Sequence, residues 1–254
     1  MPPAQIDELR KKLNALDLNG AKVVPFRADL VMDRAFFPGG NGLYMGRTAS
    51  IPVAGTLVLG SNFGRVPDFI RGGSLVRSDE TQTSNTWKGL YRMLSPETKI
   101  KLERCFFTNA WPFLHEGNSN ETKGLISAWL ADTRLMKTCV GFFKETLSVV
   151  QPKLIVALGT GAPALLSRLW PEELGEWSGS SIASMDAKPI AMVNSGGNKI
   201  ICTAITHPSH SNSRQRRPPY QDTEGEIRLL AEAALLAQLE LQGPKGGAGW
   251  TAST

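Results

Sequence analysis

Residues 153–166 read KLIVALGTGAPALL, and a strand, a turn and a helix follow one another directly within them. Lys153–Leu158 is a short apolar run rich in Ile, Val and Leu, which is typical of a β-strand buried on both faces. The glycine-containing turn at residues 159–161 then leads into a helical pattern at Pro163–Leu169. This order predicts a β-α unit of an α/β domain with parallel strands.

Three further apolar runs have the same character, and each is ended by a turn. They are Thr56–Gly60 (TLVLG), Arg104–Thr108 (RCFFT) and Lys199–Thr206 (KIICTAIT). Helical patterns lie between and after these runs, at Trp87–Leu94, Lys123–Val150 and Thr223–Leu241. Strands that alternate with helices predict an α/β fold, a three-layer α/β/α sandwich with a central, mostly parallel four-stranded sheet.

The sequence predicts a single domain with a helix near its N-terminus and a disordered tail at its C-terminus. Residues 4–16 carry Ile6, Leu9 and Leu13 at helical spacing and predict an amphipathic helix. Residues 34–52 are rich in Gly and aromatics and are expected to form a loop within the domain. Residues 243–254 (GPKGGAGWTAST) are expected to be a disordered tail, so the domain is expected to span residues 1–242.

The composition excludes several protein classes. With 254 residues, 41% hydrophobic and 20% charged, the chain is not collagen-like, mucin-like or wholly disordered. It has no apolar run long enough for a membrane span and no secretory signal. We therefore expect a cytoplasmic protein, associated with the nucleoid if bacterial, that has no membrane partner. Three separated cysteines predict a reducing compartment and neither a disulfide framework nor a four-cysteine cluster. The net charge of +5 favours a polyanionic partner.

Polar residues follow three of the predicted strands. The stretches are Gly60–Gly64 (GSNFG), Thr108–Pro112 (TNAWP) and His207–Arg214 (HPSHSNSR). Ligands of open parallel sheets bind outside the carboxyl ends of the strands. Asn62, Asn109 and His207 are therefore expected to converge on one rim, where the sequence offers neither paired carboxylates nor a serine in a GxSxG elbow.

Together these motifs resemble those of the uracil-DNA glycosylase superfamily, most closely its mismatch-specific branch. GSNFG resembles the water-activating motif, and SNTWKGLYRML at Ser84–Leu94 resembles the segment that follows it in that branch. FFTNAWP resembles the segment whose Asn reads the base edge. KLIVALGTGAPALL and ITHPSHSNSR resemble the last strand–helix pair and the His-Pro-Ser loop that enters the DNA minor groove. The resemblance covers residues 55–215.

The resemblance implies a monofunctional DNA glycosylase of base excision repair. It would flip a deaminated base, uracil, out of DNA and hydrolyse its N-glycosidic bond as a monomer, with no metal and no other cofactor. Asn62 would orient the attacking water, but an amide cannot deprotonate it, so the enzyme should be slower than one with Asp at this position. His207 would stabilise the charge on the departing base.

The remaining predicted site residues contact the base or the DNA strand. Asn109 offers a donor and an acceptor, which match O4 and N3–H of uracil and mismatch cytosine. Phe63 or Phe69 would stack on the flipped base, whereas Trp87 is expected to pack its helix onto the sheet. Phosphate contacts are expected from Ser209, Ser211, Asn212 and Ser213, and positive charge from Arg214, Arg216 and Arg217.

Other interpretations remain open. Asn62 suits a turn, Asn109 suits a strand-end cap, and aromatic residues are often simply core. His207 and His210 are three apart, but Pro208 precludes a helix between them, so no metal site is predicted. Residues 159–164 fit GxGxxA, which would suit a dinucleotide-binding oxidoreductase. A catalytically silent DNA- or nucleotide-binding protein on the same fold is the other alternative.

Overall fold

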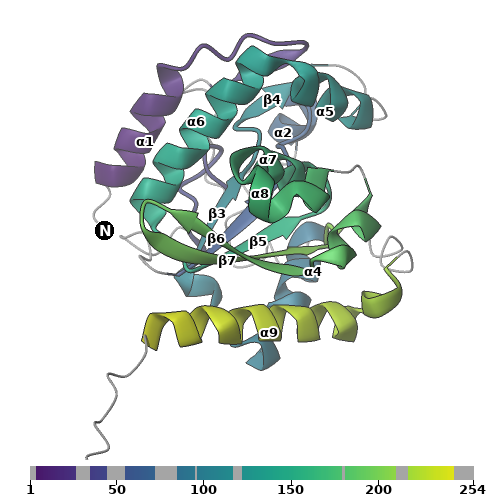
Figure 1. The fold of residues 1–254 in the computed structure, drawn as a ribbon. Coiled ribbons are helices and arrows are strands. Elements are labelled where there is room, and N and C mark those ends of the chain that lie inside the picture. Colours follow the sequence, from purple (N-terminus) through teal and green to yellow (C-terminus); the bar gives the residue numbers. More distant parts are fainter. Residues whose placement is uncertain are drawn as a thin grey trace, which may run out of the picture.

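The computed structural model describes residues 4–26, 35–44, 55–71, 85–94, 96–116, 122–178, 181–209 and 217–242. A five-stranded sheet forms the centre of the molecule (Figure 1). Its strands, in spatial order, are β3 (Cys105–Asn109), β2 (Thr56–Gly60), β5 (Leu154–Leu158), β7 (Asn198–Ile205) and β6 (Ile190–Ser195). The first four are parallel, as the sequence predicts, and β6 pairs antiparallel with β7.

The fifth strand, β6, corrects the predicted count of four. Its residues alternate between buried and exposed, whereas the other strands of the sheet are almost continuously buried. Such alternation is typical of an edge strand with one solvated face, so a search for apolar runs misses it. Gly196 and Gly197, both with positive φ, form the tight turn that joins β6 to β7.

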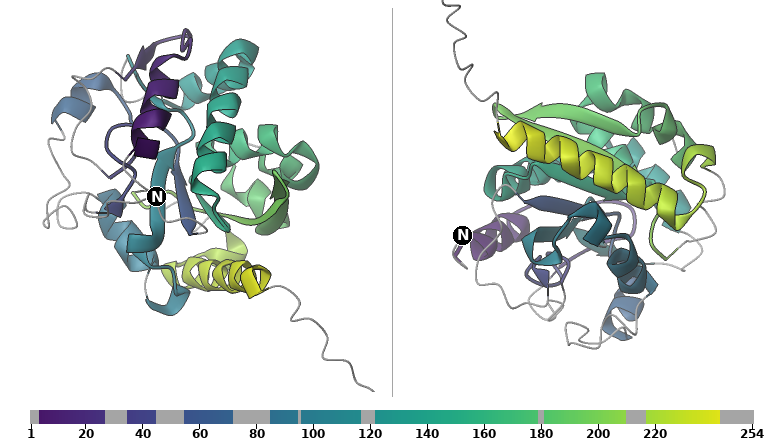
Figure 2. Two further views of the ribbon diagram at one scale, coloured as in Figure 1. Left: turned by 90° about the vertical axis from the view of Figure 1, so that its left-hand side faces the viewer. Right: turned by 90° about the horizontal axis from the view of Figure 1, so that it is seen from below.

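Helices cover both faces of the sheet. Figures 1 and 2 show α9 with α4 on one face and α1, α6 and α7 on the other. Their bounds are α1 (Ala4–Asn14), α4 (Asn85–Met93), α6 (Thr133–Val150), α7 (Gly161–Leu169) and α9 (Thr223–Gln242). Alternate residues of β2 serve the two layers: Leu57 and Leu59 pack with α6 and α7, and Val58 packs with α4 and α9. The predicted three-layer sandwich is confirmed.

The helix predicted from residue 123 to residue 150 is two helices. Asp132 separates α5 (Thr122–Ala131) from α6, and its carboxylate accepts a hydrogen bond from the Leu135 N–H at 2.9 Å. A carboxylate at this position satisfies a free backbone donor and starts a new helix. The other helices in the described residues are short: α2 (Val66–Arg71), α8 (Pro171–Leu174), and 3-10 helices η3 (Pro96–Thr98), η4 (Leu102–Arg104), η6 (Gly175–Ser178), η7 (Ile182–Ala187) and η9 (Pro218–Tyr220).

The outer edge of β3 is covered by the segment at residues 35–44. The Phe37 N–H donates to the Phe107 carbonyl at 2.9 Å, and the Phe107 N–H donates to the Gly42 carbonyl at 2.8 Å. This pairing protects a strand edge that would otherwise be open to other chains. A second, two-stranded sheet pairs β1 (Val23–Pro25) with β4 (Phe113–His115), which follows β3 along the chain. The rest of the predicted loop, residue 34 and residues 45–52, lies outside the described residues, as does the predicted tail at 243–254.

Within the described part of the chain, no helix is long and apolar enough to cross a membrane.

All three cysteines, Cys105, Cys139 and Cys202, are buried and free, so the prediction of no disulfide framework is confirmed. Burial raises the pKa of the Cys139 thiol to about 12 and raises the pKa of the other two as well. Because the thiolate is the reactive form, we expect no thiol of the native protein to react with Ellman's reagent at pH 8. All three should react once denaturant is added, and rapid labelling of the native protein would contradict this burial.

Candidate functional site

The loops after β2 and β3 run side by side at the carboxyl end of the sheet. The Ala110 N–H donates to the Gly60 carbonyl at 2.9 Å, and the Trp111 N–H donates to the Ser61 carbonyl at 3.0 Å. The strand pairing therefore continues past the ends of both strands. It holds the segment that carries Asn62 against the segment that carries Asn109.

Asn109 lies directly over Gly60. The residue is 8% exposed, and a Cβ built on Gly60 would lie 2.0 Å from the Asn109 Oδ1. Only glycine therefore leaves room for the carboxamide at this point. This carboxamide has no hydrogen-bond partner among the described residues, and it caps none of their backbone groups. Its donor and its acceptor both remain available to a ligand.

His207 follows β7 and lies against Gly159, in the turn after β5. A Cβ on Gly159 would lie 3.2 Å from the His207 Cβ, and this glycine has a φ of +72°. The Ser209 N–H lies 3.4 Å from the imidazole Nδ1, and the Ser209 hydroxyl lies 2.7 Å from the same nitrogen. A backbone N–H can only donate, so Nδ1 is assigned as the acceptor and Nε2 carries the proton of the neutral ring. Nε2 is therefore a hydrogen-bond donor.

Pro208 fixes the direction in which the chain leaves His207. It packs against Gly89 of α4, where a Cβ would lie 2.6 Å from the proline Cβ and 2.9 Å from its carbonyl oxygen. The close approach of helix and loop thus requires glycine at position 89. α4, which carries no predicted catalytic residue, is an essential support of the histidine loop.

Buried polar atoms without a partner gather at this rim. Within the described residues, the Ser61 Oγ, the Asn62 Nδ2 and the Thr206 Oγ1 are buried and form no hydrogen bond. Leaving one such group unpaired costs roughly 1–3 kcal/mol, so a cluster of them marks a place where a polar ligand is received. The Nδ2 group of Asn62 thus makes no hydrogen bond that would hold a turn within the described residues.

Of the two aromatic candidates, Phe69 is part of the core. Its ring is 2% exposed and packs edge-on against Phe26, with ring centroids 5.3 Å apart, and against Phe63 at 6.0 Å. Both faces are covered by protein, so no base can stack on it without a rearrangement. Phe63 is half-buried in the same cluster.

Phe36 is an aromatic residue that the sequence analysis did not single out. Its half-buried ring lies 3.3 Å from a Cβ built on Gly60, the point that the Asn109 carboxamide also covers. Its neighbours are Phe107, at 5.4 Å between centroids, and Trp87, at 5.9 Å. Trp87 packs α4 onto the sheet, as predicted. The only sequence signal for Phe36 is its place in a Gly- and aromatic-rich segment.

The prediction that Arg217 supplies charge to DNA is wrong, because its side chain is 0% exposed. It donates to Asp186 Oδ1 at 2.7 and 2.9 Å, to Glu226 Oε1 at 2.8 Å and to the Ala204 carbonyl at 3.1 Å. Glu226 in turn accepts the N–H of Thr206 at 2.6 Å. This buried network therefore fixes the backbone directly before His207.

The other predicted DNA contacts are only partly described. Ser209 lies beside His207 and is half-buried. Ser211, Asn212, Ser213 and Arg214 lie outside the described residues, as do His210 and Arg216.

The glycine turn after β5 is already occupied by site residues. Gly159 packs on His207, and a Cβ on Gly161 would lie 2.2 Å from the Ser61 Oγ. A dinucleotide-binding turn needs its glycines so that the pyrophosphate can approach the backbone. Here the glycines admit protein side chains instead, which argues against the oxidoreductase interpretation.

Replacing Gly89 by Ala tests the support of the histidine loop. Alanine normally stabilises a helix interior relative to glycine by about 1 kcal/mol, but here its methyl group would meet Pro208. We expect the Gly89→Ala protein to be destabilised by about 1–3 kcal/mol in urea denaturation. Gly141→Ala in α6, where nothing lies within 4 Å, should be stabilised instead. Equal stabilisation of both variants would show that Pro208 does not need this glycine.

Comparison with known proteins adds one match. The family model described as "Uracil DNA glycosylase superfamily" matches residues 79–228, which is more than half of the chain. The match includes the Asn109 and His207 segments and begins after the Asn62 loop. No curated protein matches the chain.

Proposed function

Because the chain belongs to the uracil DNA glycosylase superfamily, we propose that it hydrolyses the N-glycosidic bond of uracil in DNA as a monofunctional enzyme. The observation that supports this proposal is the Asn109 carboxamide, which lies over Gly60 at the carboxyl end of the sheet and has no hydrogen-bond partner among the described residues. We propose that the enzyme acts as a monomer, without a metal or another cofactor.

Asn109 would select the base. Its Nδ2 group would donate to O4 of uracil, and its Oδ1 would accept from N3–H. Cytosine presents an amino group and an unprotonated N3 at these positions, so a carboxamide held in the orientation that pairs with uracil would meet donor with donor and acceptor with acceptor. A buried site with such paired groups rejects the wrong partner because its own polar atoms would stay unpaired. The burial of Asn109 supports this discrimination.

His207 would stabilise the departing base. As the bond between C1′ and N1 breaks, its electron pair moves onto the base, and negative charge develops at O2. An Nε2–H donor aimed at that oxygen stabilises the charge, and a single preorganised donor of this kind is typically worth about 10²–10³ in rate. The hydrogen bonds that Ser209 makes with Nδ1 hold the ring in the tautomer that can donate.

Asn62 would hold the attacking water. Base departure leaves an oxocarbenium-like sugar, and the oxygen of the water then bonds to C1′ and loses a proton to solvent. Because this electrophile is strong, an oriented water suffices without a strong base, although the rate is lower than a carboxylate would give. The Nδ2 of Asn62 is buried and has no partner among the described residues, which supports its contact with a polar species at the rim.

Phe36 is our proposed stacking partner for the flipped base. It lies against Gly60 beside Asn109, whereas Phe69 is covered on both faces. Ser209, with Ser211, Asn212, Ser213 and Arg214, would hold the DNA backbone.

The proposal is tested with purified protein and labelled oligonucleotides, single- and double-stranded. Each would carry one uracil, hypoxanthine, xanthine or mismatched thymine, and alkali would cut any abasic site. We expect cutting at uracil in the wild type. Failure to cut any substrate at high enzyme excess, while the protein still retards the DNA in a gel, would replace the proposal with a catalytically silent DNA-binding protein.

A further inference from the structure

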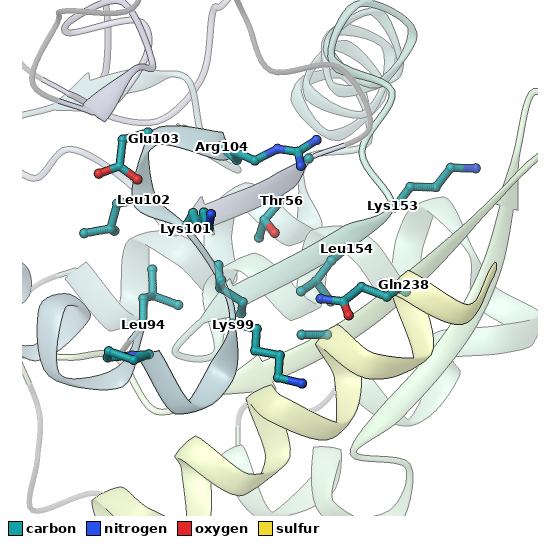
Figure 3. Close-up of a pocket in the computed structure, with 15 residues that line it drawn as sticks. Thr56, Leu94, Lys99, Lys101, Leu102, Glu103, Arg104, Lys153, Leu154 and Gln238 are labelled. Carbon is teal, nitrogen blue, oxygen red and sulfur yellow. The ribbon is translucent and has the colours of Figure 1, made fainter. Parts of the chain in front are cut away.

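A groove of about 740 Å³ lies at the opposite end of the sheet from the candidate active site (Figure 3). It is lined by the first residue of β2 (Thr56), the first residue of β5 (Leu154), the segment that precedes β3, and α9. A five-residue strand spans roughly 15 Å, so a ligand at one end of β2 leaves the other end accessible.

The floor of the groove is aliphatic. Its buried lining side chains are Leu94, Ile100, Leu102, Leu154, Ala234 and Ala237. Among the residues that line the groove, none is aromatic. The floor can therefore take aliphatic or aromatic side chains of a ligand but offers no stacking surface for nucleic-acid bases.

The rim of the groove is cationic. Lys99, Lys101 and Arg104 are exposed, and Lys153 is half-exposed, whereas Glu103 is the single acidic residue in the lining. None of the four cations forms an ion pair with a described residue. Figure 3 shows them rising from two separate segments, with Lys153 apart from the other three. Four positive charges and one negative charge thus surround an apolar floor.

We propose that this groove binds an acidic peptide segment of a partner protein. The carboxylates of such a segment would pair with the four rim cations, and its apolar side chains would pack on the floor. Complementary charge gives the contact specificity and a fast association rate, while burial of the apolar side chains holds the complex together. Nucleic acid satisfies only the rim, because its bases would find no aromatic partner. The proposal does not depend on the proposed glycosylase activity.

The test uses a fluorescein-labelled ten-residue peptide of alternating Asp and Leu, with fluorescence anisotropy as the readout. We expect the wild type to bind this peptide. It should bind a peptide of alternating Asn and Leu, which lacks the negative charge, at least tenfold more weakly. The double variant Lys101→Glu, Lys153→Glu should weaken binding of the acidic peptide at least tenfold. The control is the double variant Lys137→Glu, Lys144→Glu, which changes the net charge by the same amount at exposed positions of α6, on the face of the sheet opposite to α9. It should bind the acidic peptide like the wild type.

A second variant tests the floor. Gln238→Trp should fill part of the groove without a change of charge and should also weaken peptide binding. Equal affinity for the Asp/Leu and Asn/Leu peptides, or equal weakening by both double variants, would overturn the proposal. The proposal would also be overturned if single-stranded DNA displaced the peptide and the Lys101→Glu, Lys153→Glu protein no longer bound that DNA. The groove would then be a nucleic-acid surface.

Discussion

Gly60→Ala is expected to lower the rate of uracil release about 100-fold while the protein remains folded. The new methyl group would occupy the position 2.0 Å from the Asn109 Oδ1, so the carboxamide must move. A displacement of about 1 Å at a positioned group can cost about 10² in rate. Phe36, 3.3 Å from the same point, would be pushed as well. The one added carbon atom would thus disturb both Asn109 and Phe36, the two residues that we propose to contact the base.

The expected loss should appear in single-turnover kinetics on a uracil-containing duplex. Circular dichroism and thermal denaturation would show that the variant is folded. Gly141→Ala provides the matched control, since it adds the same methyl group in open space on α6, and its rate should equal that of the wild type. A Gly60→Ala enzyme with the wild-type rate would mean that Asn109 does not read the base from this position.

Arg217→Met is expected to lower the free energy of unfolding by about 3–5 kcal/mol. The guanidinium is fully buried between Asp186 and Glu226. Its removal leaves two carboxylates with little access to water and no cation beside them. Such a loss is a large part of the total stability of a domain. It would also loosen Thr206, whose N–H donates to Glu226, and therefore the position of His207.

Urea denaturation measures this effect, and a second arginine provides the comparison. Arg134 forms a salt bridge with Asp17 at the surface, where its side chain is 63% exposed. Exposed pairs are worth at most about 1 kcal/mol, so Arg134→Met should change stability little. Similar losses in the two variants would contradict a structural role for the buried network.

Much of the architecture follows from local patterns in the sequence. The four parallel strands are short apolar runs, and their carboxyl ends carry the polar residues of the candidate site. Asp132 illustrates a weaker signal: it divides an uninterrupted helical pattern because its carboxylate caps a new helix. β6 was not predicted because its residues alternate between buried and exposed, unlike the continuously apolar runs of the strands beside it.

The parts that could not be predicted depend on contacts between distant residues. Nothing near Arg217 in the sequence shows that it turns inward, because its partners Asp186 and Glu226 come from other elements. The sequence predicts Phe63 or Phe69 as the stacking residue and gives no signal that singles out Phe36. Only the fold buries Phe69 beside Phe26 and brings Phe36 to Gly60.

The most direct test of the proposed activity compares the wild type with the double variant Asn62→Ala, His207→Ala. Uracil release from a duplex oligonucleotide would be measured under single-turnover conditions, with the two proteins purified in parallel. We expect release by the wild type and a loss of at least about 10³ in the double variant, since a single preorganised donor is worth about 10²–10³. Equal release by both proteins, or none by the wild type, would contradict uracil hydrolysis at this site.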